Sequence, residues 1–168
     1  PLPEGHRFPM EKYDLLPKQL LHEGTCNQAD FFEPAAIDLH SIEQVHCPDY
    51  LQRLIKLQLE RKEVRKIGFP LSQQLIDREI IIAGGTVEGA KRGLKTGIAM
   101  NIAGGTHHAF SNRGEAFCLL NDQAIAAQYL LDHQLSKKIL IVDLDVHQGN
   151  GTAEIFKDNP AVFTFSMH

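Results

Sequence analysis

The sequence predicts an α/β fold in which helices flank a parallel β-sheet. The main evidence is the order of elements in the second half of the chain, where short apolar runs and helical patterns alternate as strand, helix, strand, helix, strand. The clearest run is Ile139–Val142, a continuous and β-branched-rich stretch typical of parallel strands that are buried on both faces. The length of 168 residues suits a single domain.

Helical patterns dominate the first half of the chain. One helix is expected near residues 11–21. A second is expected to begin at Pro48 and to end near Lys66, because proline at the first helical position is a start signal and apolar residues follow at helical spacing. Ser72 can cap a third helix that runs past Gly84-Gly85, and we interpret these glycines as sites of close packing rather than a break.

The second half supplies the sheet. Strands are predicted at 97–102, 139–142 and 162–166, with a helix opening at Asn121-Asp122 and a short helix at 153–157. Parallel strands end at one edge of a sheet, and ligands bind in the crevice beyond that edge. The polar segments that follow the three strands are therefore expected to converge there.

Composition excludes several classes of protein. Lys and Arg number 17 against 21 Asp and Glu, which argues against direct nucleic-acid binding, and a charged fraction of 23% argues against disorder. No apolar run could span a membrane and no export leader is visible. Three scattered cysteines are a poor disulfide framework, so we expect a cytoplasmic protein.

The segment Asp143-Leu144-Asp145-Val146-His147 has the pattern of a metal site. In an extended chain, residues i and i+2 point to the same side, so Asp145 and His147 can direct an oxygen and a nitrogen at one ion. A further carboxylate and a water would complete an open zinc site of the catalytic type. The alternative is an acidic strand end that caps a helix or faces solvent, but the position after a buried strand favours the metal.

His107 and His108 follow the first predicted strand through a Gly-Gly turn. Each can exchange a proton near neutral pH, and each needs a partner that fixes its tautomer. Asp143 and Asn150 are the candidate partners. The alternative is two surface histidines in a polar loop, and the neighbouring metal pattern favours a functional pair. Other histidines match no usable spacing and are interpreted as ordinary polar residues: His6, His22, His40, His46 and His133.

Three blocks of this chain resemble the zinc-dependent histone deacetylase superfamily: residues 104–109, 116–122 and 143–152. The segment Gly5–Met10 and Gln148 are most similar to its class IV-like and bacterial branch. The resemblance implies an arginase-deacetylase fold that hydrolyses N-acyl-lysine or a related amide. It also implies that residues 1–168 are the N-terminal part of a single catalytic domain.

The resemblance assigns roles to the paired histidines and the loop that follows the second strand. His108 would be the general base and then the general acid, oriented by Asn150. His107 would be its electrostatic partner, hydrogen-bonded to Asp143. Two zinc ligands and one structural K⁺ or Na⁺ site would complete this region. The zinc ligands would be Asp145 and His147, and the positions that bind the monovalent cation would be Asp143, Asp145, His147, Ser166 and Met167. A second, weaker cation site would lie near Phe156, Asn159 and Val162.

The match has one substitution and one gap. Phe117, by itself interpreted as a core aromatic, would line the acyl-lysine tunnel, but Ala116 stands where the family usually has glycine. The third zinc ligand and the transition-state tyrosine of the family match no residue here. We therefore expect a sheet that is incomplete at its C-terminal end, self-association through its exposed apolar edge, and little turnover from residues 1–168 alone.

Two alternatives to a lysine deacetylase remain open. The same hydrolytic chemistry would serve an acetylpolyamine or another small acylated amine. A non-catalytic module or inactive fragment would keep the fold and bind acylated protein, metal or a partner chain.

Overall fold

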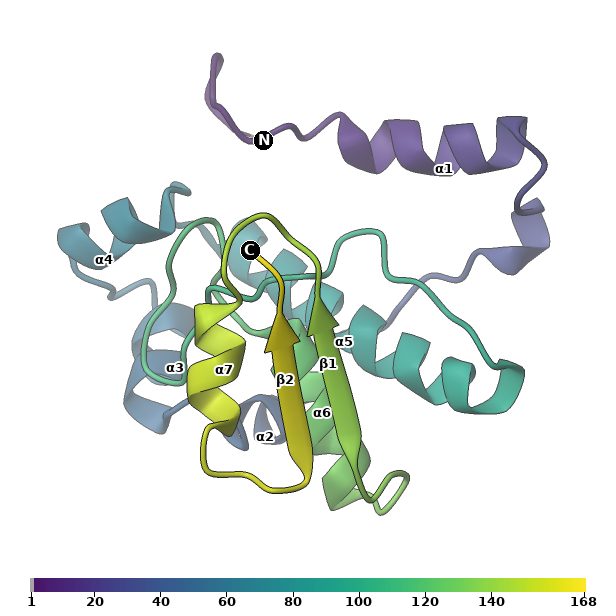
Figure 1. Ribbon diagram of the computed structural model, residues 1–168. Helices are drawn as coiled ribbons and strands as arrows, with labels where there is room; N and C mark the ends of the chain where they lie inside the picture. The colour runs from purple at the N-terminus through teal and green to yellow at the C-terminus, as the bar shows by residue number, and fades with distance from the viewer. Residues whose placement is uncertain (1) are drawn as a thin grey trace.

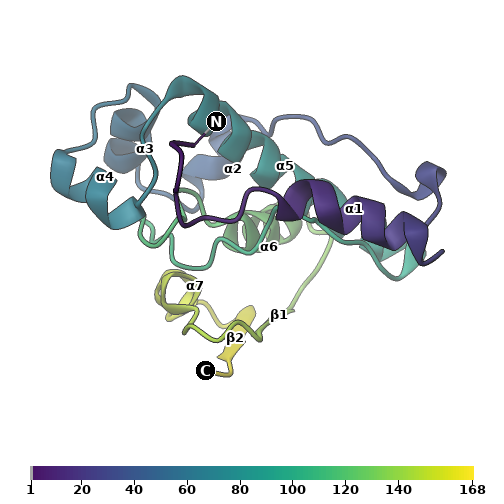
Figure 2. The same ribbon diagram turned by 90° about the horizontal axis from the view of Figure 1, so that it is seen from above.

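The computed structural model describes residues 2–168 and arranges them as a helical body with two parallel strands along one side (Figures 1 and 2). In chain order, the elements within these residues are α1 (Lys12–His22), a 3₁₀ turn (Gln28–Asp30), α2 (Leu39–Glu43), α3 (Pro48–Ile55), α4 (Arg61–Ile67), α5 (Gln73–Thr96), α6 (Asp122–Asp132), β1 (Ile139–Asp143), α7 (Asn150–Phe156) and β2 (Val162–Ser166). The predicted α/β class and both C-terminal strands are confirmed.

The strands pair in parallel, with Ile139 opposite Val162 and Asp143 opposite Ser166, and α7 lies in the crossover between them. Figure 2 shows α6 between the strands and α5, so the layers run strands, α6, α5.

The expectation that β1 is buried on both faces is wrong: Leu140 is 62% exposed and Val142 is 49% exposed. The helices lie on the other face, and the exposed face is apolar. The predicted self-association through the exposed edge of the sheet stays a prediction.

The predicted strand at 97–102 is not formed. Gly97 ends α5 with a left-handed backbone (φ +91°), and the chain continues as an irregular segment in which Ile98 is 80% exposed and Met100 is 70% exposed. A strand requires a hydrogen-bonded neighbour, and within residues 2–168 no strand lies beside this segment. Its anchor is Asn101, whose Nδ2 donates to the Ile82 carbonyl of α5 at 3.0 Å.

The helix predicted from Pro48 to Lys66 is two helices. Pro48 does open the first, but Leu57 has a left-handed backbone (φ +57°) that ends the regular path after α3. Glu60 and Glu63 then form a capping box that starts α4 in a new direction. Apolar residues keep a helical spacing on both sides of this break, because the buried positions of α3 and α4 face the same core. Spacing alone therefore predicted one helix where the structure has two.

The long helix α5 forms as predicted. The Ser72 hydroxyl accepts the Leu75 N–H at 3.2 Å, which caps the helix N-terminus. A Cβ on Gly84 would overlap the Ala35 carbonyl oxygen, and a Cβ on Gly85 would lie 3.1 Å from Asn101 Nδ2. The interpretation of these glycines as sites of close packing is therefore confirmed.

The three cysteines are free thiols, as their spacing indicated. Cys118 is buried, and burial raises the pKa of its thiol to about 12.

Within residues 2–168, the helices are all too short or too polar to cross a membrane.

We expect Gly84→Ala to destabilise the protein by about 1–3 kcal/mol, because the added methyl group meets backbone that must shift. Gly89→Ala in the same helix is the matched control. Its Cβ would lie 4.0 Å from the nearest side chain, so the helix propensity of alanine should make it neutral or stabilising by up to about 1 kcal/mol. Urea unfolding of the two variants measures both effects, and a Gly84→Ala protein as stable as Gly89→Ala would contradict the packing argument.

Candidate active site

The carboxyl ends of β1 and β2 meet the loop that carries the two histidines, as the strand order predicted. We call residues 104–109 the histidine loop. The Met167 N–H donates to the Asp143 carbonyl at 3.0 Å, which holds the two strand ends together. The first N–H groups of α7, from Gly151 and Thr152, donate to the His107 carbonyl at 3.0 and 3.2 Å. Three segments that are distant in sequence are thus joined by main-chain hydrogen bonds.

His107 is buried and held by a buried carboxylate. Its Nδ1 lies 2.5 Å from Asp143 Oδ2, so the predicted partner is confirmed as a contact. The other oxygen, Asp143 Oδ1, accepts the Asp145 N–H at 3.0 Å. A Cβ on Gly149 would overlap the Asp143 carboxylate, which explains why glycine occupies that position. The Gly149–Gly151 turn therefore makes room for this pair.

His108 is half-buried and pairs with Asn150, the second predicted partner. Its Nδ1 lies 2.8 Å from Asn150 Oδ1. An amide oxygen only accepts hydrogen bonds, so this contact places the proton on Nδ1 and leaves Nε2 as the basic nitrogen. The two rings lie beside each other, with a distance of 4.2 Å between the His107 and His108 centroids.

Asp145 and His147 lie on the exposed loop after β1. Asp145 Oδ1 and His147 Nδ1 are 2.9 Å apart, and the side chains are 52% and 72% exposed. The backbone N–H of His147 donates to the Asp145 carboxylate and lowers its pKa, so this group is ionised at neutral pH. In this structure the two atoms are hydrogen-bonded to each other, and a carboxylate oxygen and an imidazole nitrogen are donor types that suit zinc. Within residues 2–168, His, Cys, Asp and Glu form no cluster of three or more that could hold a metal ion, so the role of this pair as zinc ligands stays a prediction.

Phe117 lies on a loop with an unusual backbone. Ala116 and Phe117 both have left-handed conformations, with φ of +46° and +67°. Their N–H groups donate to the Lys66 and Ile67 carbonyls at 2.9 and 2.6 Å, which ties the loop to the end of α4. The Phe117 ring packs against the core but is only half-buried, so part of the side chain stays accessible to solvent.

The profile of the histone deacetylase domain matches residues 6–168. This chain belongs to the histone deacetylase family. It is 48% identical over its whole length to an uncharacterised protein of Picosynechococcus sp., of which it covers 56%, and 30% identical over 98% of its length to the acetoin utilization protein AcuC of Bacillus subtilis, of which it covers 45%. The chain thus spans about half the length of these relatives.

Solved structures of the family have the same fold. The structure of a histone deacetylase homologue from Aquifex aeolicus aligns with a TM-score of 0.82 and 28% identity, over 99% of this chain and 47% of that chain. A histone deacetylase homologue complexed with SAHA aligns with a TM-score of 0.83 and 27% identity, over the same shares. The arginase-deacetylase fold implied by the sequence is therefore confirmed, truncated at its C-terminal end relative to these structures.

The residues implied as monovalent-cation sites of the family also lie together. Gly149 N–H donates to the Ser166 hydroxyl at 3.1 Å, which brings Ser166 to the edge that carries the Asp145–His147 loop. Phe156, Asn159 and Val162 share one turn, in which Asn159 N–H donates to the Phe156 carbonyl at 3.0 Å. Both cation sites stay predictions.

Two histidines set aside in the sequence have structural roles. His6 Nε2 lies 3.0 Å from the Gly68 carbonyl, and its ring packs near Phe117, with 5.9 Å between centroids. His46 is buried, which lowers its pKa to about 4, and its Nε2 accepts the Asn121 N–H at 3.0 Å. The interpretation of His46 as an ordinary polar residue is wrong, because its side chain is buried in the core. For His6, the sequence feature that could have indicated a structural role is its position within the segment Gly5–Met10, which resembles the family.

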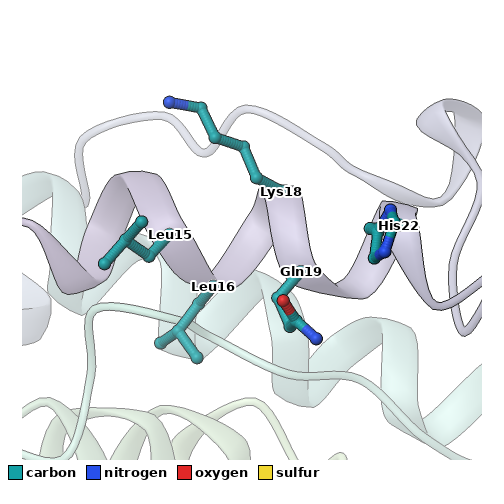
Figure 3. Close-up of a pocket in the computed structure, with 5 residues that line it drawn as sticks. All are labelled: Leu15, Leu16, Lys18, Gln19 and His22. Atoms are coloured by element: carbon teal, nitrogen blue, oxygen red, sulfur yellow. The ribbon is translucent and has the colours of Figure 1, made fainter.

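A groove along α1 is separate from this site. It is lined by Leu15, Leu16, Lys18, Gln19 and His22 (Figure 3). None of the residues that the histone deacetylase family implies for catalysis lines it, so the candidate active site is the histidine pair at the sheet edge.

We expect Ala116→Gly to stabilise the protein by up to about 1 kcal/mol, because a left-handed backbone strains alanine and not glycine. The reverse change at another exposed left-handed position is the matched control. Gly105 has φ +88°, and a Cβ placed on it would have no atom within 4 Å, so Gly105→Ala should cost about 1–2 kcal/mol through backbone strain alone. Thermal unfolding measures both, and a loss of stability in Ala116→Gly would contradict the strain argument.

Proposed function

We propose that residues 1–168 are the N-terminal part of one zinc-dependent deacetylase domain that hydrolyses N-acetyl or N-acyl lysine. The observation that carries this proposal is the histidine pair, in which each ring has its own partner beside a zinc-type donor pair. Family membership supports deacetylase chemistry, and the family structure complexed with SAHA, an acyl-lysine mimic, supports an acylated-lysine substrate.

Asp145 and His147 would hold the zinc ion together with a ligand from outside residues 1–168. When bound, zinc supplies Lewis-acid polarisation of the amide carbonyl and makes the attacking water more acidic. The lowered pKa of Asp145 suits this role, because a zinc ligand must be deprotonated. The exposure of both side chains leaves this point of the loop open to further ligands.

His108 would move the proton. Its Nε2 is free to accept a proton from the attacking water, while Nδ1 stays bonded to the Asn150 oxygen. The resulting imidazolium donates from both nitrogens, so the Asn150 contact is kept and Nε2 can protonate the leaving amine. His107, held by the Asp143 carboxylate, would stabilise the charge that develops beside it.

We expect His108→Ala to lower kcat for an acetyl-lysine peptide by about 10²–10⁴-fold in the complete domain, because it removes the group that moves the proton. His40→Ala is the control, since His40 is exposed on α2 away from the site. Steady-state kinetics with an acetyl-lysine peptide and an acetylated polyamine also separates the two substrate classes. Equal activity of the His108 and His40 variants would rule out the proposed role.

We expect the complete domain to bind about one zinc ion and Asp145→Ala to lose most of it, because the variant removes a charged ligand. Elemental analysis of the purified proteins measures the stoichiometry. Asp49→Ala, which removes an exposed carboxylate on α3, is the control and should keep the metal. Zinc retained by Asp145→Ala would exclude Asp145 as a ligand.

A further inference from the structure

The dipeptide Asn121-Asp122 lies between the long helix α5 and the histidine loop, and the mechanism above gives it no role. Both side chains are buried, with Asn121 fully inaccessible and Asp122 1% exposed. Asn121 caps α6, since its side chain accepts the Ala124 N–H at 3.0 Å. A helix cap needs only one side-chain oxygen, so the cap does not account for a buried carboxylate at the next position.

The Asp122 carboxylate is bonded to the histidine loop just before the two histidines. Its Oδ1 accepts the Thr106 N–H at 2.8 Å and lies 2.6 Å from the Thr106 hydroxyl, and the Gly105 N–H points at the carboxylate at 3.1 Å. In return, the Asp122 N–H donates to the Thr106 hydroxyl oxygen at 3.1 Å. One carboxylate therefore holds the two residues that precede His107.

The Gly104-Gly105 turn is shaped around this carboxylate. A Cβ on Gly104 would overlap Asp122 Oδ2, and Gly105 has the left-handed backbone that turns its N–H toward the carboxylate. On the side of α5, Asp122 Oδ2 accepts the Thr86 hydroxyl at 2.6 Å. The carboxylate thus has one set of bonds to the loop and one bond to the helix.

Asn121 holds the loop on the other side of the histidines. Its Nδ2 donates to the Ala109 carbonyl at 2.9 Å and lies 3.0 Å from the Thr152 hydroxyl of α7. Its backbone N–H is fixed by the buried His46. Together the two side chains bond to the histidine loop at residues 105–106 and at residue 109, on either side of His107 and His108.

We infer that Asn121 and Asp122 are positioning residues that set the location of both catalytic histidines. We call this pair the 121–122 clamp. The inference rests on the proposed function, and it assigns Asp122 an effect on turnover rather than on stability alone. A displacement of about 1 Å at a catalytic group can cost about 10²-fold in rate, and the bonds of Asp122 are two residues or fewer from His107.

The test compares Asp122→Asn with Thr86→Val in the complete domain. Asparagine keeps the size of the side chain but replaces one oxygen with a donor that faces the loop N–H groups. Valine at Thr86 removes the hydroxyl that donates to Asp122 and accepts the Asn101 Nδ2 at 2.7 Å, and it leaves the hydrogen bonds between Asp122 and the histidine loop in place. The readouts are kcat and KM per correctly folded molecule, the thermal midpoint, and amide hydrogen exchange at Gly105 and Thr106.

We expect Asp122→Asn to lower kcat by about 10²-fold with little change in KM, and to speed amide exchange at Gly105 and Thr106. Thr86→Val should lower the thermal midpoint but keep kcat within about twofold of the unsubstituted protein, because the loop keeps its bonds. Thr106→Val, which preserves the buried charge and removes the loop hydroxyl, gives the same comparison if Asp122→Asn does not fold.

An unchanged kcat in Asp122→Asn and Thr106→Val, or an equal loss of kcat in Thr86→Val, would overturn the inference and leave the pair a structural feature. If the unsubstituted domain does not hydrolyse acetyl-lysine, the proposed function fails, and the exchange comparison still decides the clamp. Faster exchange in Asp122→Asn alone would support it, and equal exchange in the three proteins would overturn it.

Discussion

A carboxylate that is buried at the first turn of a helix must find its hydrogen-bond donors inside the protein, because an unpaired charge there would be strongly destabilising. Asp122 meets this constraint with donors from α5 and from the histidine loop. The loop can supply them only by turning through two glycines, and that turn sets where His107 and His108 emerge. The arrangement of the site therefore depends on the burial of one charged group.

A second buried carboxylate links the site to the sheet. Asp143 is the last residue of β1, and its two oxygens have different partners, the ring of His107 and the backbone of Asp145. Asp143 thereby holds both the His107 ring and the start of the loop that carries Asp145 and His147. The parallel register of β1 and β2 delivers Asp143 and Ser166 to the same edge.

The sequence was most informative where function and local chemistry coincide. The pairs His107–Asp143 and His108–Asn150 were predictable because both partners lie in short motifs that were expected at one sheet edge, although the strand predicted before the histidines is not formed. The boundaries of β2 and the opening of α6 followed from the same local signals. The zinc ion, the monovalent cations and the branch within the family stay predictions.

The errors have physical causes that local patterns do not contain. The segment 97–102 has the composition of a strand but lacks a neighbour within residues 2–168, and pairing is a property of two segments. The break at Leu57 is invisible to periodicity, because the buried positions on both sides face one core. His46 and Asp122 owe their roles to burial and to partners more than fifteen residues away, which no spacing rule reaches.

The loop at Ala116 and Phe117 is attached to the end of α4 through main-chain groups, with N–H donors on one side and the Lys66 and Ile67 carbonyls on the other. Carbonyl acceptors are the same whatever side chain the residue carries. Mutation can therefore replace the side chains at 66 and 116 while the path of the loop is inherited unchanged. Related proteins can therefore carry different side chains beside Phe117 while the hydrogen bonds between this loop and α4 stay the same.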